Sequence, residues 1–268
     1  MIGSQIFVKM FEARLIQGSL LKRVLETVKD LLNFATFDCN DEGIQLQAMD
    51  ISHVSLMSIN MRADGFDVFL CNKFIRMGVD LAEMSKILKY ATNKDIITMK
   101  VEDESETITF TFESPNKRKV TPTRTMKMNM KLTNFEQEPL GIPDTNYSAV
   151  IKMPSDELQR VVKELSEFGN SLVINCAKEG EVKFAAAGDN GTGNIRFTHG
   201  GEEEAVTIKV QEPVILTFAC NYLNMFTKAS HLASQVSLHM SHDSPMLIEY
   251  NIGEIGHVRF YLAPKIED

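Results

Sequence analysis

The chain has 268 residues, of which 44% are hydrophobic and 24% are charged, and its formal net charge at pH 7 is -8. This composition excludes a disordered chain and provides for one large core or two ordinary ones. No apolar run approaches the roughly 20 residues of a membrane span, and the opening MIGSQIFVKM lacks the apolar region of a secretory signal. We therefore expect a globular protein that stays inside the cell.

Four segments have apolar residues at the spacing of amphipathic helices. In chain order they are residues 19–32, 81–91, 155–168 and 219–229. Ser19 and Ser155 stand where side-chain caps of the first and third helix are expected. Asp156 and Glu157 lie in the first turn of the third, and Phe168 at its end is expected to face the core.

Short runs of alternating apolar and polar residues fill most of the chain between these helices, which is the pattern of half-buried strands. Turns that contain Gly or Asn separate many of the runs and favour antiparallel neighbours. The clearest runs are GIQLQAM (43–49), TITFTFE (107–113), TMKMNMKL (125–132), EAVTIKV (204–210), QVSLHM (235–240) and HVRFYLA (257–263). The sequence therefore predicts an α+β fold built mainly of antiparallel sheets.

The order of elements occurs twice. FEARLIQGSLLKRVLETV at 11–28 resembles YSAVIKMPSDELQRVVKEL at 147–165, and the same succession of strands and a second helix follows each. The segment between the halves carries Pro139, Gly141 and Pro143 and is expected to be extended. We expect an N-terminal domain at 10–132, a connecting loop at 133–146 and a C-terminal domain at 147–268.

Lys86 and Lys89 stand three apart on the outer face of the second helix. Ordinary solvation explains such a face, and the isoelectric point of about 5.4 is unlike that of most duplex-binding domains. An alternative is that the helices gather on one surface that meets DNA while acidic sheets and loops face away. Contacts would then be few, directed at phosphates and sensitive to salt.

An enzyme is a further alternative, but its signals are weak. GDNGTGN at 188–194 lacks the Lys-Ser/Thr of a phosphate loop and precedes a strand pattern, which favours a hairpin turn. His239 and His242 are spaced poorly for a metal site on an alternating strand. No nucleophile with an identifiable base appears, so we expect no enzyme, no cofactor and no metal.

Several motifs together resemble the proliferating cell nuclear antigen family, the eukaryotic DNA sliding clamps. They run in order from Met10 to the C-terminus and include LQAMDISHVSL (46–56), MGVDLAEMSKILKYA (77–91), LGIPDTNYS (140–148) and YLAPKIED (261–268). The resemblance implies two similar clamp domains in each chain and three chains closed head to tail into a ring. Helices would line the hole, sheets would form the outer wall, and residues 1–9 would be an extension.

By this resemblance the basic residues of the helices face the phosphates of an encircled duplex. They are Lys22, Arg23, Lys29, Lys86, Lys89, Arg160, Lys163 and Lys228. The implied function is that of a processivity factor for a replicative polymerase and a docking platform for replication and repair proteins in the nucleus. A subunit of a heterotrimeric checkpoint ring is the alternative within the same family.

The resemblance also implies an apolar pocket for partner peptides. Its residues are Met49, His53, Val54, Leu56, Leu140, Ile142, Pro143, Pro245, Tyr261, Ala263, Pro264 and Ile266. DNA polymerase, the clamp loader, flap endonuclease and DNA ligase would insert an aliphatic and two aromatic side chains there. Lys178 matches the position at which the family is modified by ubiquitin. The chain departs from the family in a longer segment before LGIP, at 117–139, and in a shortened edge strand within GNIRFTHGGEEEAVTIKV (193–210).

Overall fold

The computed structural model describes residues 9–103, 105–115, 122–133, 140–142, 145–177, 180–189, 191–198 and 206–266. These residues form two compact units. The first unit takes the described residues within 1–48, 59–139 and 254–256, and the second takes those within 49–58, 140–253 and 257–268. Residues 49–58 thus group with the second unit, although they lie inside the stretch assigned from sequence to the first domain.

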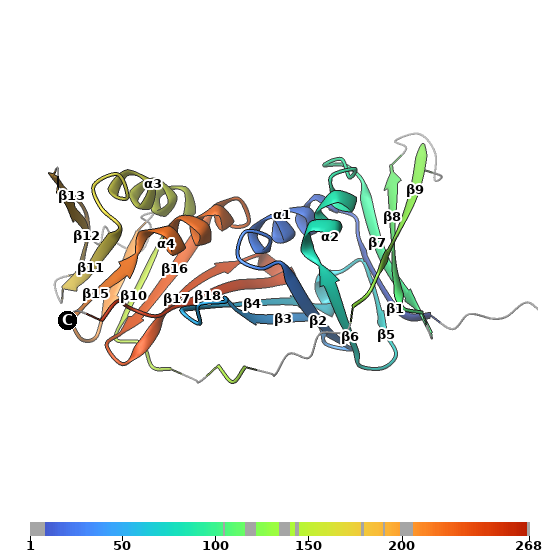
Figure 1. Ribbon diagram of the computed structural model, residues 1–268, viewed down its shortest axis with the longest axis horizontal. Coiled ribbons are helices and arrows are strands. Elements are labelled where there is room, and N and C mark those ends of the chain that lie inside the picture. The colour runs from blue at the N-terminus through green and yellow to red at the C-terminus, as the bar shows by residue number, and fades with distance from the viewer. Residues whose placement is uncertain are drawn as a thin grey trace, which may run out of the picture. The chain divides into compact units, whose positions relative to one another are not determined.

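The elements of the first half of the chain are mostly strands, with two α-helices (Figure 1). In chain order they are β1 (Lys9–Leu15), α1 (Ser19–Val28), β2 (Phe34–Asn40), β3 (Gly43–Met49), β4 (Ser55–Arg62), β5 (Val68–Cys71), β6 (Ile75–Asp80), α2 (Leu81–Leu88), β7 (Ile96–Glu102), β8 (Thr107–Ser114) and β9 (Arg124–Lys131). A short 3-10 turn, Ala63–Gly65, lies between β4 and β5.

The second half repeats this succession. It consists of β10 (Ala149–Pro154), α3 (Ser155–Leu165), β11 (Ser171–Ala177), β12 (Glu181–Gly188), β13 (Gly191–Thr198), β14 (Thr207–Val210), β15 (Val214–Ala219), α4 (Cys220–Phe226), β16 (Gln235–Ser241), β17 (Ser244–Asn251) and β18 (Gly256–Leu262). Two 3-10 turns, Thr227–His231 and Gly253–Ile255, accompany them.

The sheets of the two halves have the same strand order. In the first half the neighbours run β5-β1-β7-β8-β9 and β4-β3-β2-β6, and in the second they run β14-β10-β16-β17-β18 and β13-β12-β11-β15. Strand pairs in both halves are antiparallel, for example β1 with β7, where Phe11 lies opposite Val101, and β10 with β16, where Ile151 lies opposite Leu238. The predicted α+β fold of two similar, mainly antiparallel domains is confirmed.

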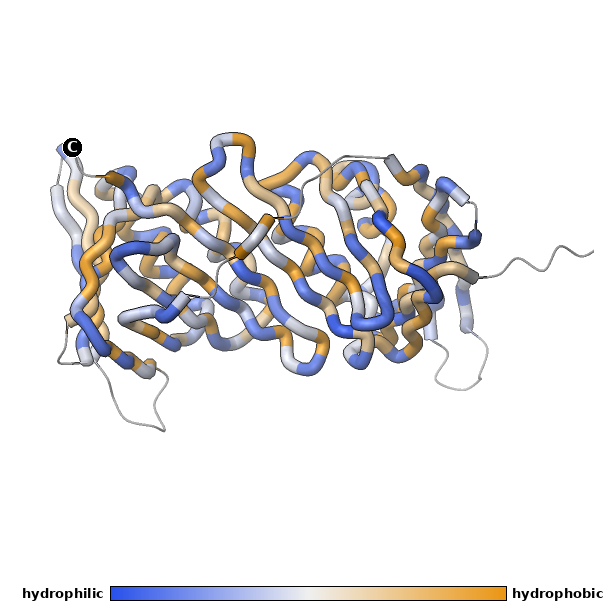
Figure 2. The backbone as a smooth tube through the Cα atoms, turned by 90° about the horizontal axis from the view of Figure 1, so that it is seen from below, coloured by the Kyte–Doolittle hydropathy of each residue, from blue (hydrophilic) through white to orange (hydrophobic). Residues whose placement is uncertain are grey.

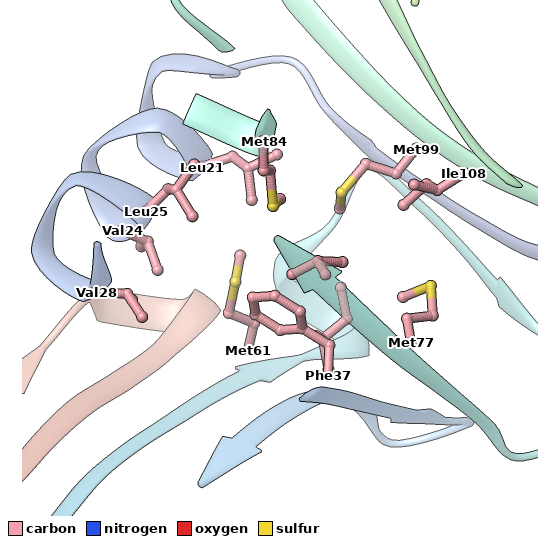
Figure 3. Close-up of a pocket in the computed structure, with 12 residues that line it drawn as sticks. Leu21, Val24, Leu25, Val28, Phe37, Met61, Met77, Met84, Met99 and Ile108 are labelled. Carbon is pink, nitrogen blue, oxygen red and sulfur yellow. The ribbon is translucent and has the colours of Figure 1, made fainter. Parts of the chain in front are cut away.

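Alternation along the strands places one face of each sheet in a core. The burial pattern of β8 and β18 changes from residue to residue. In Figure 2, hydrophilic and hydrophobic residues alternate along many stretches of the tube. In the first unit, α1 turns Leu21 and Leu25 toward Phe37 and Met61 of the sheet (Figure 3). An apolar cavity of about 30 Å³ remains between the helix and the sheet there.

The helices begin and end differently from the sequence prediction. The α1 helix ends at Val28, and its N-cap is Gly18, with no side-chain bond from Ser19. Gly18 is required because a Cβ there would lie 2.4 Å from Ile97 Cγ1. The prediction of Ser155 as a cap was also wrong, because β10 runs directly into α3 at Pro154 and leaves the Ser155 hydroxyl buried without a partner among the described residues.

Phe168 is another correction, because its side chain is 44% exposed instead of packed in the core. The α3 helix ends at Leu165, so Phe168 is no longer on its buried face. The ring lies over β13, where a Cβ on Gly193 would come within 2.9 Å of it. The sequence prediction extended the helical spacing past the end of the helix.

The side-chain cap that the structure does show is on α2. One carboxylate oxygen of Asp80 accepts hydrogen bonds from the backbone N–H groups of Ala82 and Glu83, at 2.8 and 3.0 Å. We expect Asp80→Ala to lower the free energy of unfolding by about 1 kcal/mol, the usual effect of losing such a cap. Denaturant titration followed by circular dichroism measures it.

Ser155→Ala is the matched control for this prediction, because it removes the cap residue that the sequence suggested on α3. Since the hydroxyl is buried without a partner among the described residues, its loss should leave stability unchanged or slightly raised. Equal losses in the two variants would contradict the assignment of both helix starts.

Candidate DNA-facing helices and partner pocket

In the first unit, the basic residues named from sequence lie on α1, on α2 and just after each helix. Lys29, Lys86 and Lys89 are exposed and line one surface groove of about 530 Å³, whereas Lys22 and Arg23 on α1 are half-buried. Asp30 and Asp80 also line this groove. The groove therefore carries both signs of charge, with three amines that can meet phosphate.

Lys86 is not an isolated cation. Its amine donates to Glu83 at 2.5 Å, one turn earlier on α2. The hydrogen bond and the charge of Glu83 raise the pKa of Lys86, so the amine stays protonated at neutral pH. Exposed pairs of this kind contribute little to stability, but the carboxylate competes with any phosphate that approaches Lys86.

In the second unit, Arg160 and Lys163 are exposed on α3. Arg160 donates to both carboxylate oxygens of Glu157, at 2.7 and 2.5 Å. Lys228 is exposed as well, but it stands in the 3-10 turn Thr227–His231 and not in the predicted helix, because α4 ends at Phe226. Each unit thus presents its basic residues on its own pair of helices and the turns that follow them.

The side chain of Gln159 holds that turn against α3. Its amide donates to the backbone carbonyl of Thr227 at 3.1 Å and accepts from the Ser230 hydroxyl at 3.1 Å. Gln159 precedes Arg160 in the chain, so the bonds fix the turn of Lys228 close to the basic residues of α3. The placement of Lys228 therefore comes from a tertiary contact and not from helix periodicity.

The second unit also contains a pocket of about 230 Å³. Three stretches of the chain build most of its wall: the segment around β4's start, the connecting segment and the end of β18. The lining residues are Met49, His53, Val54, Ser55, Leu56, Gly141, Ile142, Thr145, Tyr147, Pro245, Tyr261 and Ala263. Most of these side chains are apolar or aromatic, so the pocket suits an apolar ligand group.

Eight of the pocket residues named from sequence line this cavity together. They are Met49, His53, Val54, Leu56, Ile142, Pro245, Tyr261 and Ala263. Leu140, Pro264 and Ile266 do not line it, and Ile266 is 90% exposed. Pro143 and Lys178 lie outside the described residues.

A backbone bond joins two of the walls. The N–H of Ala263 donates to the carbonyl of Val54 at 3.1 Å, so the end of β18 runs beside the start of β4. Further along, Lys265 donates from its backbone N–H to Thr217 and from its amine to the Ser171 hydroxyl, both at 2.7 Å. These bonds hold the chain between Tyr261 and Lys265 in place at the pocket's edge.

Sequence reasoning missed Tyr147 as a wall residue. Its ring meets the ring of His239 edge-on, with 5.4 Å between centroids. Burial raises the pKa of the Tyr147 phenol and lowers that of His239, so both rings are neutral at physiological pH. The available signal was position, because Tyr147 lies within the LGIPDTNYS motif (140–148).

No group of three or more potential ligands that could hold a metal ion occurs in the part of the chain that the structure describes. His239 packs on Tyr147, whereas the Nε2 of His242 lies 3.2 Å from the carbonyl of Pro213, so the two rings serve different contacts. Burial raises the pKa of the Cys176 thiol to about 12, which keeps it protonated. At GDNGTGN, β12 pairs antiparallel with β13, and Gly188 lies opposite Gly191.

None of the described helices has the length and hydropathy to cross a membrane. Family models match both halves of the chain. The model of the proliferating cell nuclear antigen N-terminal domain matches residues 10–138, and that of the C-terminal domain matches residues 141–265. Domains of this family are non-enzymatic scaffolds that act on DNA in replication and repair, so the prediction that the chain is not an enzyme is confirmed. The chain belongs to the proliferating cell nuclear antigen family of DNA sliding clamps.

Proposed function

We propose that three copies of this chain close head to tail around duplex DNA and act as the processivity factor of a replicative polymerase in the nucleus. The same ring docks replication and repair proteins through the pocket of each second unit. The main observation behind the proposal is that Met49, Ile142 and Tyr261, from distant parts of the chain, line the same cavity. Residues 10–132 and 147–268 would be the two clamp domains, joined by the loop 133–146 and preceded by an extension at 1–9.

Sheet edges support the closed ring. Among the described residues, β9 ends one sheet of the first half and β13 ends one sheet of the second, and each has a strand neighbour on one side. Unpaired strand edges are open to pairing with another chain. β9 of one chain can therefore pair with β13 of the next chain in a head-to-tail interface. Such an interface closes into a ring when the rotation from one chain to the next divides a full turn evenly.

The charge pattern supports loose binding to the duplex. Exposed cations such as Lys29, Lys89 and Lys163 lie on or beside the helices, while the whole chain carries a net charge of -8. Negative charge elsewhere discourages DNA from binding outside the ring. A clamp held by topology needs only weak phosphate contacts, and contacts to phosphate carry no base sequence information.

The pocket supports peptide docking. Its wall offers apolar and aromatic surface, which suits the aliphatic and two aromatic side chains of clamp-binding peptides. DNA polymerase, the clamp loader, flap endonuclease and DNA ligase are the partners that we propose to bind in this way. Lys178 is proposed as a ubiquitin acceptor on the family match of its position alone.

The edge strands lead to a prediction about assembly. Native mass spectrometry at micromolar concentration should show three copies of the 30.2 kDa chain, about 91 kDa. We expect Ile195→Asp on β13 to reduce the trimer to monomer, because it places a charge at the half-buried edge. Ile215→Asp on β15, the opposite edge strand of the same sheet, is the control and should stay trimeric. A wild-type monomer would instead favour a subunit of a heterotrimeric checkpoint ring.

The pocket leads to a second prediction. Ile142→Ala combined with Tyr261→Ala should weaken binding of a peptide with one aliphatic and two aromatic anchors by at least roughly a hundredfold, because both anchors lose their wall. Isothermal titration calorimetry measures the affinity, and native mass checks that the ring persists. Ile215→Ala, which removes an exposed aliphatic group from the same unit, should bind as the wild type does. Unchanged affinity in the double variant would exclude this pocket.

The basic helices lead to a third prediction. Lys89→Ala should weaken binding to a short linear duplex more than Lys86→Ala does. The Lys86 amine already forms an ion pair with Glu83, which reduces its contribution to phosphate binding. Fluorescence anisotropy over a salt series should show a slope of log K against log salt that is shallower by roughly 0.9 for each phosphate that the variant no longer neutralises. Lys152→Ala, on strand β10, is the control and should leave the slope unchanged. Equal slopes in all variants would contradict phosphate contact by α2.

A further inference from the structure

The loop between β3 and β4 supplies two residues of the pocket wall, His53 and Val54. It closes on itself through the Asp50 N–H, which donates to the Ser55 carbonyl at 2.9 Å, and the His53 N–H, which donates to the Asp50 carbonyl at 3.0 Å. His53 has a φ of 56°, the left-handed region that non-glycine residues seldom adopt. Such a conformation persists only when the surroundings hold it.

The Asp50 carboxylate holds this loop from inside. One of its oxygens accepts from the backbone N–H groups of Val54 and Ser55, at 2.9 and 2.6 Å. The other accepts from the Ser52 N–H at 3.1 Å and from the hydroxyl of Tyr222 at 2.7 Å. Burial acts to raise the pKa of Asp50, but these hydrogen bonds outweigh it and lower the pKa, so the acceptor is charged at neutral pH.

Tyr222 reaches the loop from a fixed position on α4. The two residues are 172 positions apart in the chain, so the bond is a tertiary anchor and not a local turn. Behind Tyr222, the ring of Phe226 lies 6.1 Å away and stacks on Phe260 of β18 at 4.6 Å. Both phenylalanines are fully buried, and Phe260 precedes the pocket residue Tyr261. Tyr222 therefore packs against Phe226, which in turn packs on Phe260, the neighbour of the pocket residue Tyr261.

We propose that Tyr222 and Asp50 are positioning residues for the partner pocket: their hydrogen bond holds the 50–55 loop in the shape that places His53 and Val54 in the wall before a peptide binds. Neither residue lines the pocket itself. The inference rests on the proposed docking function. A preformed wall raises the affinity for the peptide, because the loop loses no further conformational entropy when the peptide binds.

The test compares Tyr222→Phe, Asp50→Asn and the double variant in the full-length protein, with the clamp-binding peptide of a flap endonuclease as the probe. Tyr222→Phe should weaken binding roughly three- to tenfold, as expected for a lost hydrogen bond to a charged acceptor whose effect reaches the pocket only through the loop. Asp50→Asn should weaken it at least as much. The double variant should be no weaker than Asp50→Asn alone, because both changes remove the same bond.

Tyr250→Phe is the matched control, since it removes a phenol oxygen that is buried in the same unit without a partner among the described residues. Its affinity should equal that of the wild type. Hydrogen exchange gives a second readout: in Tyr222→Phe the amides of Ser52, Val54 and Ser55 should exchange faster, while those of β16 should not change.

The outcomes separate the two proposals. Wild-type affinity in Tyr222→Phe, or an equal loss in Tyr250→Phe, overturns the positioning role while leaving peptide docking intact. Failure of the wild type to bind the peptide overturns the docking function. In that case the hydrogen exchange of the loop amides still tests whether Tyr222 holds the loop. Unchanged exchange of these amides in Tyr222→Phe would contradict that role.

Discussion

The packing of amphipathic helices on antiparallel sheets is the constraint on which the rest of the structure depends. Each helix can bury only one stripe, and α1 and α3 bury theirs through residues such as Leu21, Leu25, Leu158 and Val162. The remaining face has to stay in solvent. Most charged residues of these helices therefore lie toward solvent, which is where a clamp needs cations. The DNA-facing surface that we propose is thus a consequence of how the cores are closed.

The same cations show how little affinity such a surface needs. Lys86 and Arg160 each have a glutamate one turn earlier, so part of their charge is neutralised within the helix. That arrangement would be a poor design for tight or base-specific binding. For a ring retained by topology it is suitable, because weak contacts that form and break quickly do not stop the ring from sliding. The acidic balance of the whole chain acts in the same direction.

Partner recognition depends on a different kind of structure. The pocket is built from loops and strand ends, and loops keep a defined shape only when their polar backbone groups have partners. Here the Asp50 carboxylate and the Ala263 N–H provide those partners. The conformation of His53 is the local cost of this arrangement. Binding surface and scaffold are therefore joined through a few hydrogen bonds, and the bond from Tyr222 connects the loop to a helix.

The sequence by itself determined the elements and their repetition. Alternation in TITFTFE and helical spacing in SLLKRVLETVKDLL are local properties, and each forms the predicted kind of element. The strand β8 has nearly the predicted bounds, whereas α1 begins at Ser19 as predicted but ends at Val28. Motif resemblance named most of the pocket residues and the basic helix positions. Local pattern failed for the caps at Ser19 and Ser155 and for Phe168 at the end of α3, because neighbouring strands and close contacts such as Gly18 against Ile97 decide those ends.

Only the tertiary structure decided which side chains act together. The pairing of Lys86 with Glu83, the 3-10 turn that carries Lys228, and the exclusion of Ile266 from the pocket depend on distances that no spacing rule gives. Tyr147 and Tyr222 were not singled out for the pocket from sequence, since their partners His239 and Asp50 lie far away in the chain, in the second case by 172 residues. Periodicity describes neighbours within one turn or one strand, whereas a site is made of groups that meet only after the sheets have closed.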